Sequence, residues 1–192
     1  MGDYALESDV KEGHGKGKGN GDNDSNFSNI SLRPFSLSDV EDSMLWASDD
    51  KVTRFCTWES EDGINFFKNK VIPHPWFKAI CLNDKPIGAI SVTPNSGNCA
   101  QCRAVIGYAV ASNYWGKGIA TRAVKMVANT IFGEWPHLQR LEATVDVENL
   151  ASQRVLQKAG FKKEGVLRKY IILKGKAIDV VMFSLLSTDP GI

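Results

Sequence analysis

The stretch over residues 107–123 constrains the fold more than any other part of the chain, because the spacing of its apolar residues changes within it. Up to Ala111 the stretch is apolar on both faces, as in a buried strand. Gly116 and Gly118 then predict a tight turn, and from Ile119 the apolar residues recur at helical spacing. The sequence therefore predicts a buried strand, a glycine turn and a helix start in direct succession.

This strand, turn and helix form a candidate phosphate site. The first N–H groups of a helix have no partner within the helix, and the helix dipole favours negative charge there. Glycines let a phosphate approach the backbone, because no side chain blocks it. The P-loop pattern requires Ser or Thr after Gly-Lys, whereas Gly118 follows Lys117 here. The dinucleotide pattern requires a third glycine where this chain has Thr121, so both nucleotide patterns are excluded.

The composition predicts one domain behind a polar tail. The chain has 192 residues, of which 43% are hydrophobic and 23% charged, as in an ordinary soluble domain. Residues 1–28 are rich in Gly, Asp, Asn, Ser and Lys, and such a segment buries too little apolar surface to offset its ordering entropy. We therefore expect a disordered tail over residues 1–28 and a single domain over residues 29–192.

The charge balance excludes several classes of partner. The net charge of +1 gives no argument for nucleic acid or a membrane surface as a partner. Residues 1–30 carry −3, so the remainder carries +4, which suits an anionic cofactor. The sequence lacks both a long apolar run that would span a membrane and a secretory signal. We expect a cytoplasmic protein, with the nucleus as a second location, that is a monomer or a homodimer.

The cysteines and histidines predict no metal site. Cys99 and Cys102 form a Cys-x-x-Cys motif, but no second pair follows. His14, His74 and His137 are scattered along the chain, so a zinc ion would lack ligands. In a cytosolic chain the four cysteines are expected to be free thiols, and the role of the Cys-x-x-Cys motif stays open.

Local signals predict the element order β-α-α-β-β-β-α-β-α-β-β. Ser38-Asp39-Val40-Glu41 has the pattern of a capping box, and Asn149 is a candidate helix cap. The predicted elements are strand 30–34, a helix from residue 38, helix 60–71, strands 76–82, 86–93 and 103–111, helix 119–133, strand 141–148, a helix from Asn149 to Gly160, and strands 161–173 and 176–185.

Together with the turn, four short motifs resemble the RimJ/RimL-type branch of the GNAT acetyltransferases. Within the turn, the run from Trp115 to Ala120 is similar to the coenzyme A signature Arg/Gln-x-x-Gly-x-Gly/Ala; Gly118 and Ala120 fit it, whereas Trp115 replaces the usual Arg or Gln. The resemblance extends from about Ile30 to Leu185. The four motifs are Leu32-Arg33-Pro34, Ile106-Gly107-Tyr108, Asn149-x-x-Ser152 and Lys158-Ala159-Gly160-Phe161.

The resemblance implies an α/β (α+β) fold with acetyl-CoA as cosubstrate and no metal. The expected sheet is mixed, mostly antiparallel and seven-stranded, with about four flanking helices, and it splays between its two central strands to hold the pantetheine arm. The backbone N–H of Val110 would then bond the acetyl oxygen. The residues implied to hold the pyrophosphate are Trp115, Gly116, Lys117, Gly118, Ile119, Ala120 and Thr121.

The implied catalytic groups lie at the start of the last helix. Many GNAT enzymes place a proton-donating Tyr where this chain has Leu156, which has no proton to donate. The resemblance offers Ser152 as the proton donor for the leaving thiolate. The alternative is a first-turn serine that bonds its own backbone. Asn149 is expected both to cap the helix and to bond the pantetheine arm.

The general base is open, because the Glu that relatives often carry before Ile-Gly-Tyr is Val105 here. The candidates are Glu59, Asp146, Glu148 and a water relay. A substrate amine with a pKa near 10 must lose a proton at neutral pH before it can attack.

The acceptor is expected to be a primary amine, either a protein N-terminus or a small molecule. Trp58 and Tyr108 are candidates for lining its pocket, with core packing as the alternative for Tyr108. A second hypothesis for the function is a non-catalytic module that binds coenzyme A, which the apolar Val105 and Leu156 support.

Overall fold

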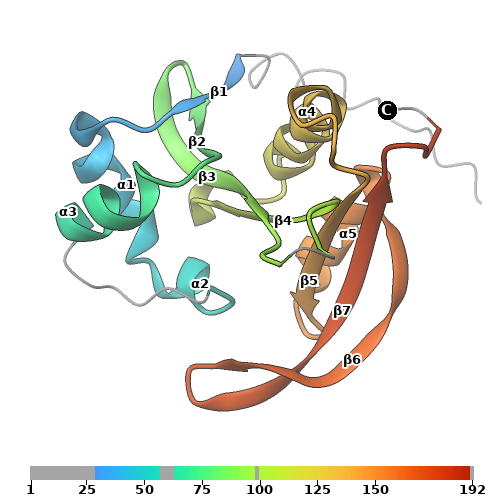
Figure 1. Ribbon diagram of the computed structural model, residues 1–192. Helices are drawn as coiled ribbons and strands as arrows, with labels where there is room; N and C mark the ends of the chain where they lie inside the picture. Colours follow the sequence, from blue (N-terminus) through green and yellow to red (C-terminus); the bar gives the residue numbers. More distant parts are fainter. Residues whose placement is uncertain (1–28, 57–62, 98–99, 191–192) are drawn as a thin grey trace, which may run out of the picture.

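A seven-stranded sheet forms the centre of the computed structural model, which describes residues 29–56, 63–97 and 100–190 (Figure 1). The strand order is β1-β2-β3-β4-β5-β7-β6, and all neighbours are antiparallel except β4 and β5. The predicted tail lies outside the described residues. The strands are β1 (Ile30–Pro34), β2 (Phe77–Leu82), β3 (Lys85–Pro94), β4 (Arg103–Val110), β5 (Arg140–Asp146), β6 (Lys162–Leu173) and β7 (Lys176–Leu186).

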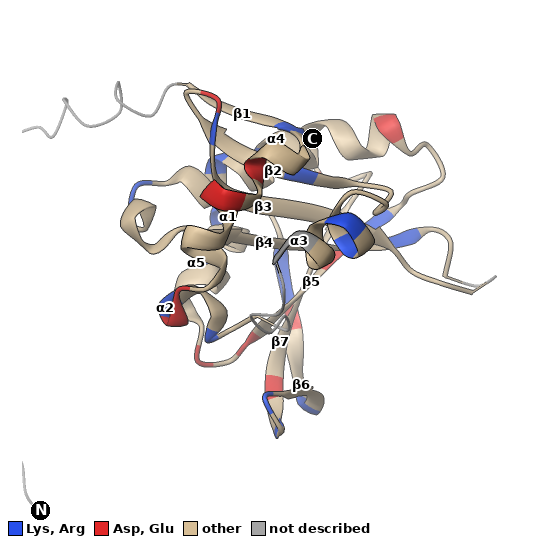
Figure 2. Ribbon diagram, turned by 90° about the vertical axis from the view of Figure 1, so that its left-hand side faces the viewer, with Lys and Arg blue, Asp and Glu red and all other residues tan. Residues whose placement is uncertain are grey.

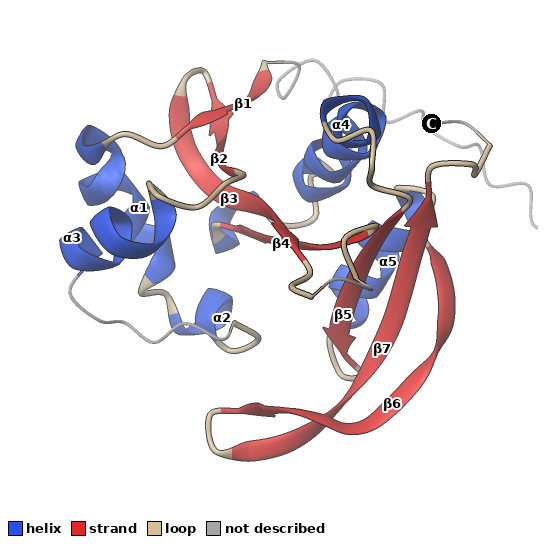
Figure 3. Ribbon diagram, viewed as in Figure 1, coloured by secondary structure: helices blue, strands red, loops and turns tan. Residues whose placement is uncertain are grey.

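The helices gather in two groups, with α1, α2 and α3 apart from α4 and α5 (Figure 3). The predicted fold class is confirmed, and the second predicted helix is the short α3 continued by a π-helical segment. The α-helices and shorter helical segments are η2 (Leu37–Asp39), α1 (Val40–Ala47), α2 (Asp50–Thr53), α3 (Gly63–Phe66), η3 (Phe67–Val71), η4 (Ser112–Tyr114), α4 (Ile119–Glu134) and α5 (Leu150–Lys158).

Each face of the sheet packs on its own group of helices, because successive side chains of a strand point to opposite faces. On one face Ile106 and Val110 of β4 belong to the main core with Leu156 of α5 and the apolar stripe of α4. On the other face Ala109 packs in a smaller cluster with Trp46 of α1. The central strand β4 is therefore covered on both sides, as its two-faced apolar sequence predicted.

Strands β4 and β5 part after a short parallel contact. Their pairing covers only residues 103–105 of β4 and 140–142 of β5. Beyond it β4 stays paired with β3 as far as Val110, and β5 stays paired with β7 as far as Asp146. The predicted splay between the two central strands is thus confirmed by the register. We call the space between residues 106–110 of β4 and 143–146 of β5 the β4–β5 separation.

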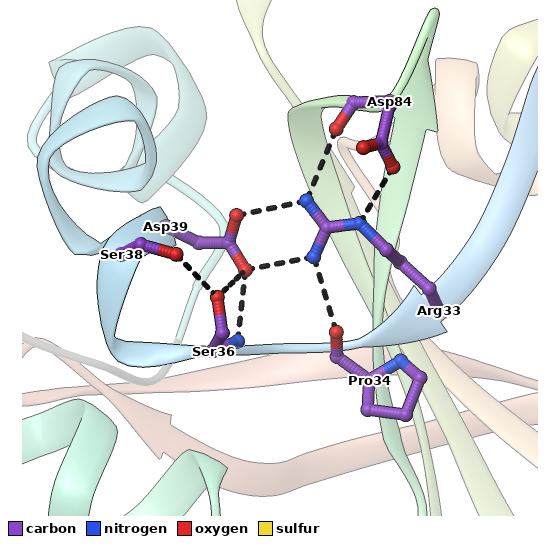
Figure 4. A network of polar contacts seen from close by, with 6 residues as sticks. All are labelled: Arg33, Pro34, Ser36, Ser38, Asp39 and Asp84. Atoms are coloured by element: carbon purple, nitrogen blue, oxygen red, sulfur yellow. Dashed lines mark hydrogen bonds and ion pairs between the residues drawn. The ribbon is translucent and has the colours of Figure 1, made fainter.

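One guanidinium joins three segments near the beginning of the domain (Figure 4). The side chain of Arg33 on β1 donates to both carboxylate oxygens of Asp39 at 2.8 Å. It also donates to the side chain and the backbone carbonyl of Asp84, at 2.9 and 3.0 Å, in the turn between β2 and β3. Arg33 therefore fixes the start of the first helices against the sheet.

This network moves the predicted capping box. The sequence analysis placed the box at Ser38–Glu41, but in the structure it consists of Ser36 and Asp39 and opens η2. The carboxylate of Asp39 accepts hydrogen bonds from the backbone N–H and hydroxyl of Ser36, at 2.8 and 2.9 Å. Since Arg33 binds the same carboxylate, its ion pair with Asp39 favours Ser36 over Ser38 as the cap.

Replacing Asp39 with Asn is expected to lower the free energy of unfolding by about 2 kcal/mol at neutral pH. The hydrogen bonds from Arg33 hold the pKa of the Asp39 carboxyl at about 2, below its ordinary value of 3.8. A depressed folded-state pKa stabilises the fold above the unfolded pKa, and this contribution is lost as the pH falls from 3.8 to about 2. Urea unfolding at a series of pH values measures the effect.

The matched control is Asp42→Asn, which removes an exposed carboxylate of α1 that pairs with Lys85 at 2.9 Å. Surface pairs of this kind contribute little, so this variant should unfold almost like the wild type. Equal losses in the two variants, or a loss for Asp39→Asn that stays constant down to the lowest pH, would contradict the role given to the Arg33–Asp39 pair.

Candidate active site

The predicted glycine turn lies between the end of β4 and the first residue of α4. Gly118 is the N-cap of α4 with φ 75°, and Gly116 has φ 76°. Both values fall in the left-handed region, which side chains with a Cβ rarely adopt. A Cβ added at either glycine would have no neighbour within 4 Å. The backbone conformation therefore requires glycine here, while the space in front of the turn is open to a ligand.

The partial positive charge at the start of α4 is not compensated by side chains of this helix. No side chain caps the helix, and its first turn contains no acidic residue. The first backbone bond along the helix runs from the N–H of Arg122 to the carbonyl of Gly118, at 3.0 Å. The preceding N–H groups of Ile119, Ala120 and Thr121 therefore lie at the positive end of a 16-residue helix, where an anion is favoured.

Two side chains brace the turn from within. The indole N–H of Trp115 donates to the carbonyl of Val110 at 2.7 Å, which ties the turn back to the end of β4. The ammonium group of Lys117 donates to the carbonyl of Asn113 at 2.9 Å and lies 5.3 Å from the ring centroid of Tyr114. The sequence analysis gave Trp115 as a departure from the family signature and as one of the residues implied to hold the pyrophosphate. Its bracing bond is a contact that sequence reasoning missed.

The backbone N–H of Val110 points toward the β4–β5 separation. Ala111 donates to the carbonyl of Ile87 at 2.8 Å, and Ala109 pairs with Ala89 in the same register. Because hydrogen-bonding residues alternate along an antiparallel strand, the N–H and carbonyl of Val110 face away from β3. Strand β5 has already left β4 at this level. The donor therefore faces the separation, and its role as a main-chain oxyanion contact stays a prediction.

The start of α5 holds the two other predicted residues side by side. The side-chain oxygen of Asn149 accepts from the backbone N–H of Ser152 at 3.1 Å, so the predicted cap is confirmed. Ser152 is half-buried, and its hydroxyl forms no hydrogen bond with the described part of the chain. In the structure the Ser152 hydroxyl therefore does not bond its own backbone, which was the alternative. Leu156 is fully buried in the core.

Tyr108 connects β4 to α5 across the β4–β5 separation. Its phenol donates to the backbone carbonyl of Ser152 at 3.1 Å. Within the described residues, this is the only hydrogen bond from β4 beyond Val105 to either β5 or α5. Burial raises the pKa of Tyr108 to about 12, so the phenol keeps its proton. The Tyr108 ring packs against the main core, which was the expected alternative. Its hydrogen bond to Ser152 is a further contact that the sequence did not indicate.

The candidate bases differ in their surroundings. Glu59, like Trp58, lies outside the described residues. Glu148 is exposed and pairs with Arg54, which follows α2, at 3.6 Å. Asp146, at the end of β5, accepts from the backbone N–H of Glu148 at 2.8 Å. The pair of Arg54 and Glu148 links the segment after α2 to the connection between β5 and α5.

The thiols show no sign of a metal or redox site within the described residues. Cys56, Cys81 and Cys102 are free thiols, while Cys99 lies outside these residues. Burial raises the pKa of Cys56 to about 12, so this thiol stays protonated. No group of three or more potential metal ligands occurs in the part of the chain that is described. No helix there is long and apolar enough to cross a membrane.

Comparison with known proteins connects this geometry to one family. Residues 29–162 match the family model described as "Acetyltransferase (GNAT) domain". An uncharacterized N-acetyltransferase, p20, of Bacillus licheniformis is 46% identical over 87 residues, which are 45% of this chain and 48% of that protein. The matches span about half the length of the curated relatives.

Two solved structures resemble the whole domain. RimJ of Mycobacterium smegmatis, in complex with CoA-disulfide, is 25% identical with a TM-score of 0.72 over 85% of this chain and 84% of that one. The Microcin C7 self immunity acetyltransferase MccE, in complex with acetyl-CoA and AMP, is 26% identical with a TM-score of 0.71 over 83% and 93% of the two chains. The predicted resemblance to the GNAT acetyltransferases is thereby confirmed.

Replacing Gly118 with Glu is expected to abolish binding of coenzyme A. The new side chain fills the open space before the turn, and its carboxylate repels the pyrophosphate. Isothermal titration of the pure protein with coenzyme A measures the loss. Gly97→Glu is the matched control, because Gly97 also has positive φ and open surroundings but lies in the loop before β4.

The control separates ligand binding from backbone strain. Both variants place a Cβ in the left-handed region, so both are expected to lose some stability. Only Gly118→Glu should lose the ligand. Unchanged affinity in this variant, or an equal loss in Gly97→Glu, would refute the assignment of the turn.

Proposed function

Because the chain belongs to the GNAT acetyltransferase family, we propose that it transfers the acetyl group of acetyl-CoA directly to a primary amine. The proposal rests on two features that lie together at the end of β4. A glycine turn exposes the first N–H groups of α4, and the N–H of Val110 faces a strand separation beside it. The acceptor is a protein N-terminus or a small amine.

The turn and β4 are proposed to bind the cosubstrate. Bound acetyl-CoA would supply a thioester, whose carbonyl carbon an amine can attack. Backbone N–H groups of residues 115–121 hold the pyrophosphate. The N–H of Val110 donates to the acetyl oxygen and stabilises the charge that develops there during attack. Since both contacts come from the main chain, the fold itself supplies them before the ligand arrives.

Ser152 is proposed to donate the proton that the leaving thiolate needs. Its hydroxyl has no competing partner among the described residues, and its backbone is fixed from two sides. Asn149 uses its side-chain oxygen for the cap, so its amide nitrogen is left to donate to the pantetheine arm. Tyr108 acts on Ser152 rather than on the substrate, because its phenol holds the carbonyl of that residue.

Asp146 is the described carboxylate best suited to receive the proton from the amine. Glu148 has its charge compensated by Arg54, whereas Asp146 forms no ion pair within the described residues. Asp146 stands at the end of β5, where this strand borders the separation. Glu59 and a water relay remain the other candidates from the sequence.

Non-catalytic binding of coenzyme A is the alternative function. Its support from the sequence was the apolar character of Val105 and Leu156. The names of the relatives, which are N-acetyltransferases, favour catalysis instead. Ser152 also provides a hydroxyl that a pure binding module would not need.

Thiol release from acetyl-CoA distinguishes the two functions. The purified full chain is mixed with acetyl-CoA and, in turn, with polyamines, amino acids and short peptides that have free N-termini. We expect at least one of these amines to raise the release of thiol well above the rate without an amine. Binding of acetyl-CoA without release for any amine would support the non-catalytic module, and Gly118→Glu serves as the inactive control.

Ser152→Ala is expected to lower kcat by about 100-fold, since general acid catalysis typically contributes that much. The affinity for coenzyme A should stay almost unchanged, because the hydroxyl serves the leaving group. Ser187→Ala is the control, as this exposed serine follows β7 beside the paired ends of β4 and β5. A Ser152→Ala enzyme with full kcat would remove this residue from the mechanism.

Tyr108→Phe tests the positioning role in the same assay. The variant keeps the ring in the core and removes only the bond to the Ser152 carbonyl. We expect a smaller loss in kcat, about tenfold, and no further loss when it is combined with Ser152→Ala, because both act through one hydroxyl. Additive losses would show that Tyr108 acts independently of Ser152.

A further inference from the structure

The β4–β5 separation begins at a contact that is only three residues long on each strand. The two strands meet over residues 103–105 and 140–142 and then run apart (Figure 1). Just before this contact, the carbonyl of Cys102 accepts from the N–H groups of Gln139 and Arg140, at 2.8 and 3.1 Å. So short a parallel ladder contributes few main-chain bonds. The angle at which β4 leaves β5 therefore depends on what else holds the two strands together here.

Side chains of opposite charge surround this contact. Basic and acidic residues, blue and red in Figure 2, both occur along β5 and β6. One carboxylate oxygen of Glu142 on β5 accepts from Arg103 on β4, at 3.3 Å, and from Arg140 on β5, at 2.6 Å. The Arg140 guanidinium also pairs with Glu164 on β6, whose carboxylate accepts from the hydroxyl of Ser184 on β7 at 2.6 Å. We call these five residues the apex network.

Glu142 is the member of the apex network that connects the two separating strands. Among the residues that the structure describes, its bond with Arg103 is the one ion pair that joins β4 to β5. The Glu142 side chain is 9% exposed and points away from the main core, to which its neighbours Leu141 and Ala143 belong. Burying a carboxylate is costly unless it is paired, and two guanidinium groups pair with this one.

Without this carboxylate the contact would be repulsive. Arg103 and Arg140 are direct partners in the register of the parallel pair. Like charges on facing strand positions repel each other and destabilise the pairing. The same Glu142 oxygen accepts from both guanidinium groups and so neutralises their repulsion. Glu142 thus makes the contact between the two strands attractive.

The contact is a hinge between two halves of the sheet. Residues 104–110 of β4 are paired with β3, and residues 140–146 of β5 are paired with β7. Each half is therefore continuous on its own side, whereas the two halves share only the three paired positions of β4 and β5. A change at the hinge alters the distance between the halves further along, where the N–H of Val110 faces the separation.

We infer that Glu142 is a positioning residue for acetyl transfer: by joining Arg103 to Arg140, it sets the width of the β4–β5 separation at Val110. The assignment rests on the proposed function, because the Val110 N–H matters only if it binds the acetyl oxygen. Glu142 acts through the strands and does not touch the substrate. Its two ion pairs also distinguish it from Asp146, the carboxylate proposed to receive the proton of the amine.

Glu142→Gln and Glu164→Gln form a matched pair of variants. Each replaces a carboxylate that binds Arg140 with an amide of the same length, and each changes the net charge equally. Only Glu142→Gln leaves Arg103 and Arg140 facing each other without a compensating charge. In the thiol-release assay we expect Glu142→Gln to lower kcat by about 100-fold, since a misplacement of about 1 Å can cost that much. Glu164→Gln should keep kcat close to that of the wild type.

Hydrogen exchange of the full chain reports the state of the contact without requiring turnover. In Glu142→Gln the backbone amides of residues 103–106 and 140–143 should exchange at least about tenfold faster than in the wild type, because the contact opens more easily. In Glu164→Gln these amides should exchange as in the wild type. The melting temperature is expected to fall in both variants, so stability alone does not distinguish them.

Removing the second positive charge provides a rescue. In the double variant Arg103→Gln, Glu142→Gln the repulsion between the two arginines is gone, so we expect slow exchange at the contact and most of kcat to return. Loss of a catalytic base could not be repaired in this way. If Glu142→Gln does not fold, the double variant must still fold with the exchange pattern of the wild type. A double variant that also fails to fold would contradict the assignment.

Three outcomes overturn the assignment. The first is that Glu142→Gln and Glu164→Gln have equal kcat and equal exchange at the contact, which would leave the network a purely structural role. The second is a double variant that performs no better than Glu142→Gln. The third is a double variant with slow exchange but without recovery of kcat, which would place Glu142 in the chemistry itself. Absence of thiol release in the wild type would instead overturn the proposed acetyl transfer, and the exchange data would still test the hinge.

Discussion

The short parallel contact between β4 and β5 is the constraint on which the site depends. β4 stays paired with β3 and β5 stays paired with β7, so the sheet remains continuous although β4 and β5 separate. The opening leaves main-chain donors of β4 unpaired, and buried donors need a partner. At the same level Gly88 allows β3 to approach closely, since a Cβ there would lie 2.4 Å from the carbonyl oxygen of Ala109. β4 is thus held firmly by β3 where it is released by β5.

Local signals in the sequence were sufficient to predict the helices and strands, the glycine turn before α4 and the Asn149 cap. The change of period after Gly118 predicted where β4 ends and α4 begins, because both elements bury apolar faces of different spacing. Asn149 could be identified as a cap because the residues that it serves are its own neighbours. The strand separation has no such local signature, and only the resemblance to a family indicated it.

Contacts between distant segments account for what the sequence did not indicate. Ser36–Asp39 and Ser38–Glu41 both fit the capping-box pattern, and the ion pair of Asp39 with Arg33 favours Ser36 as the cap. Tyr108 reads as a core residue in its strand, yet its phenol reaches Ser152, which lies 44 residues later. Such contacts depend on how strands are ordered in the sheet, which periodicity does not specify.

The two sides of the site therefore differ in how they can vary. The proposed cosubstrate side consists of backbone groups at the glycine turn and at Val110, so it is preserved wherever the fold and the glycines are preserved. On the proposed acceptor side, Arg54 after α2 pairs with Glu148 in the connection between β5 and α5, so side chains from distant parts of the chain meet there. Those side chains can change without altering the turn. Membership in the family therefore indicates the reaction, whereas the choice of acceptor depends on side chains that can vary independently of the turn.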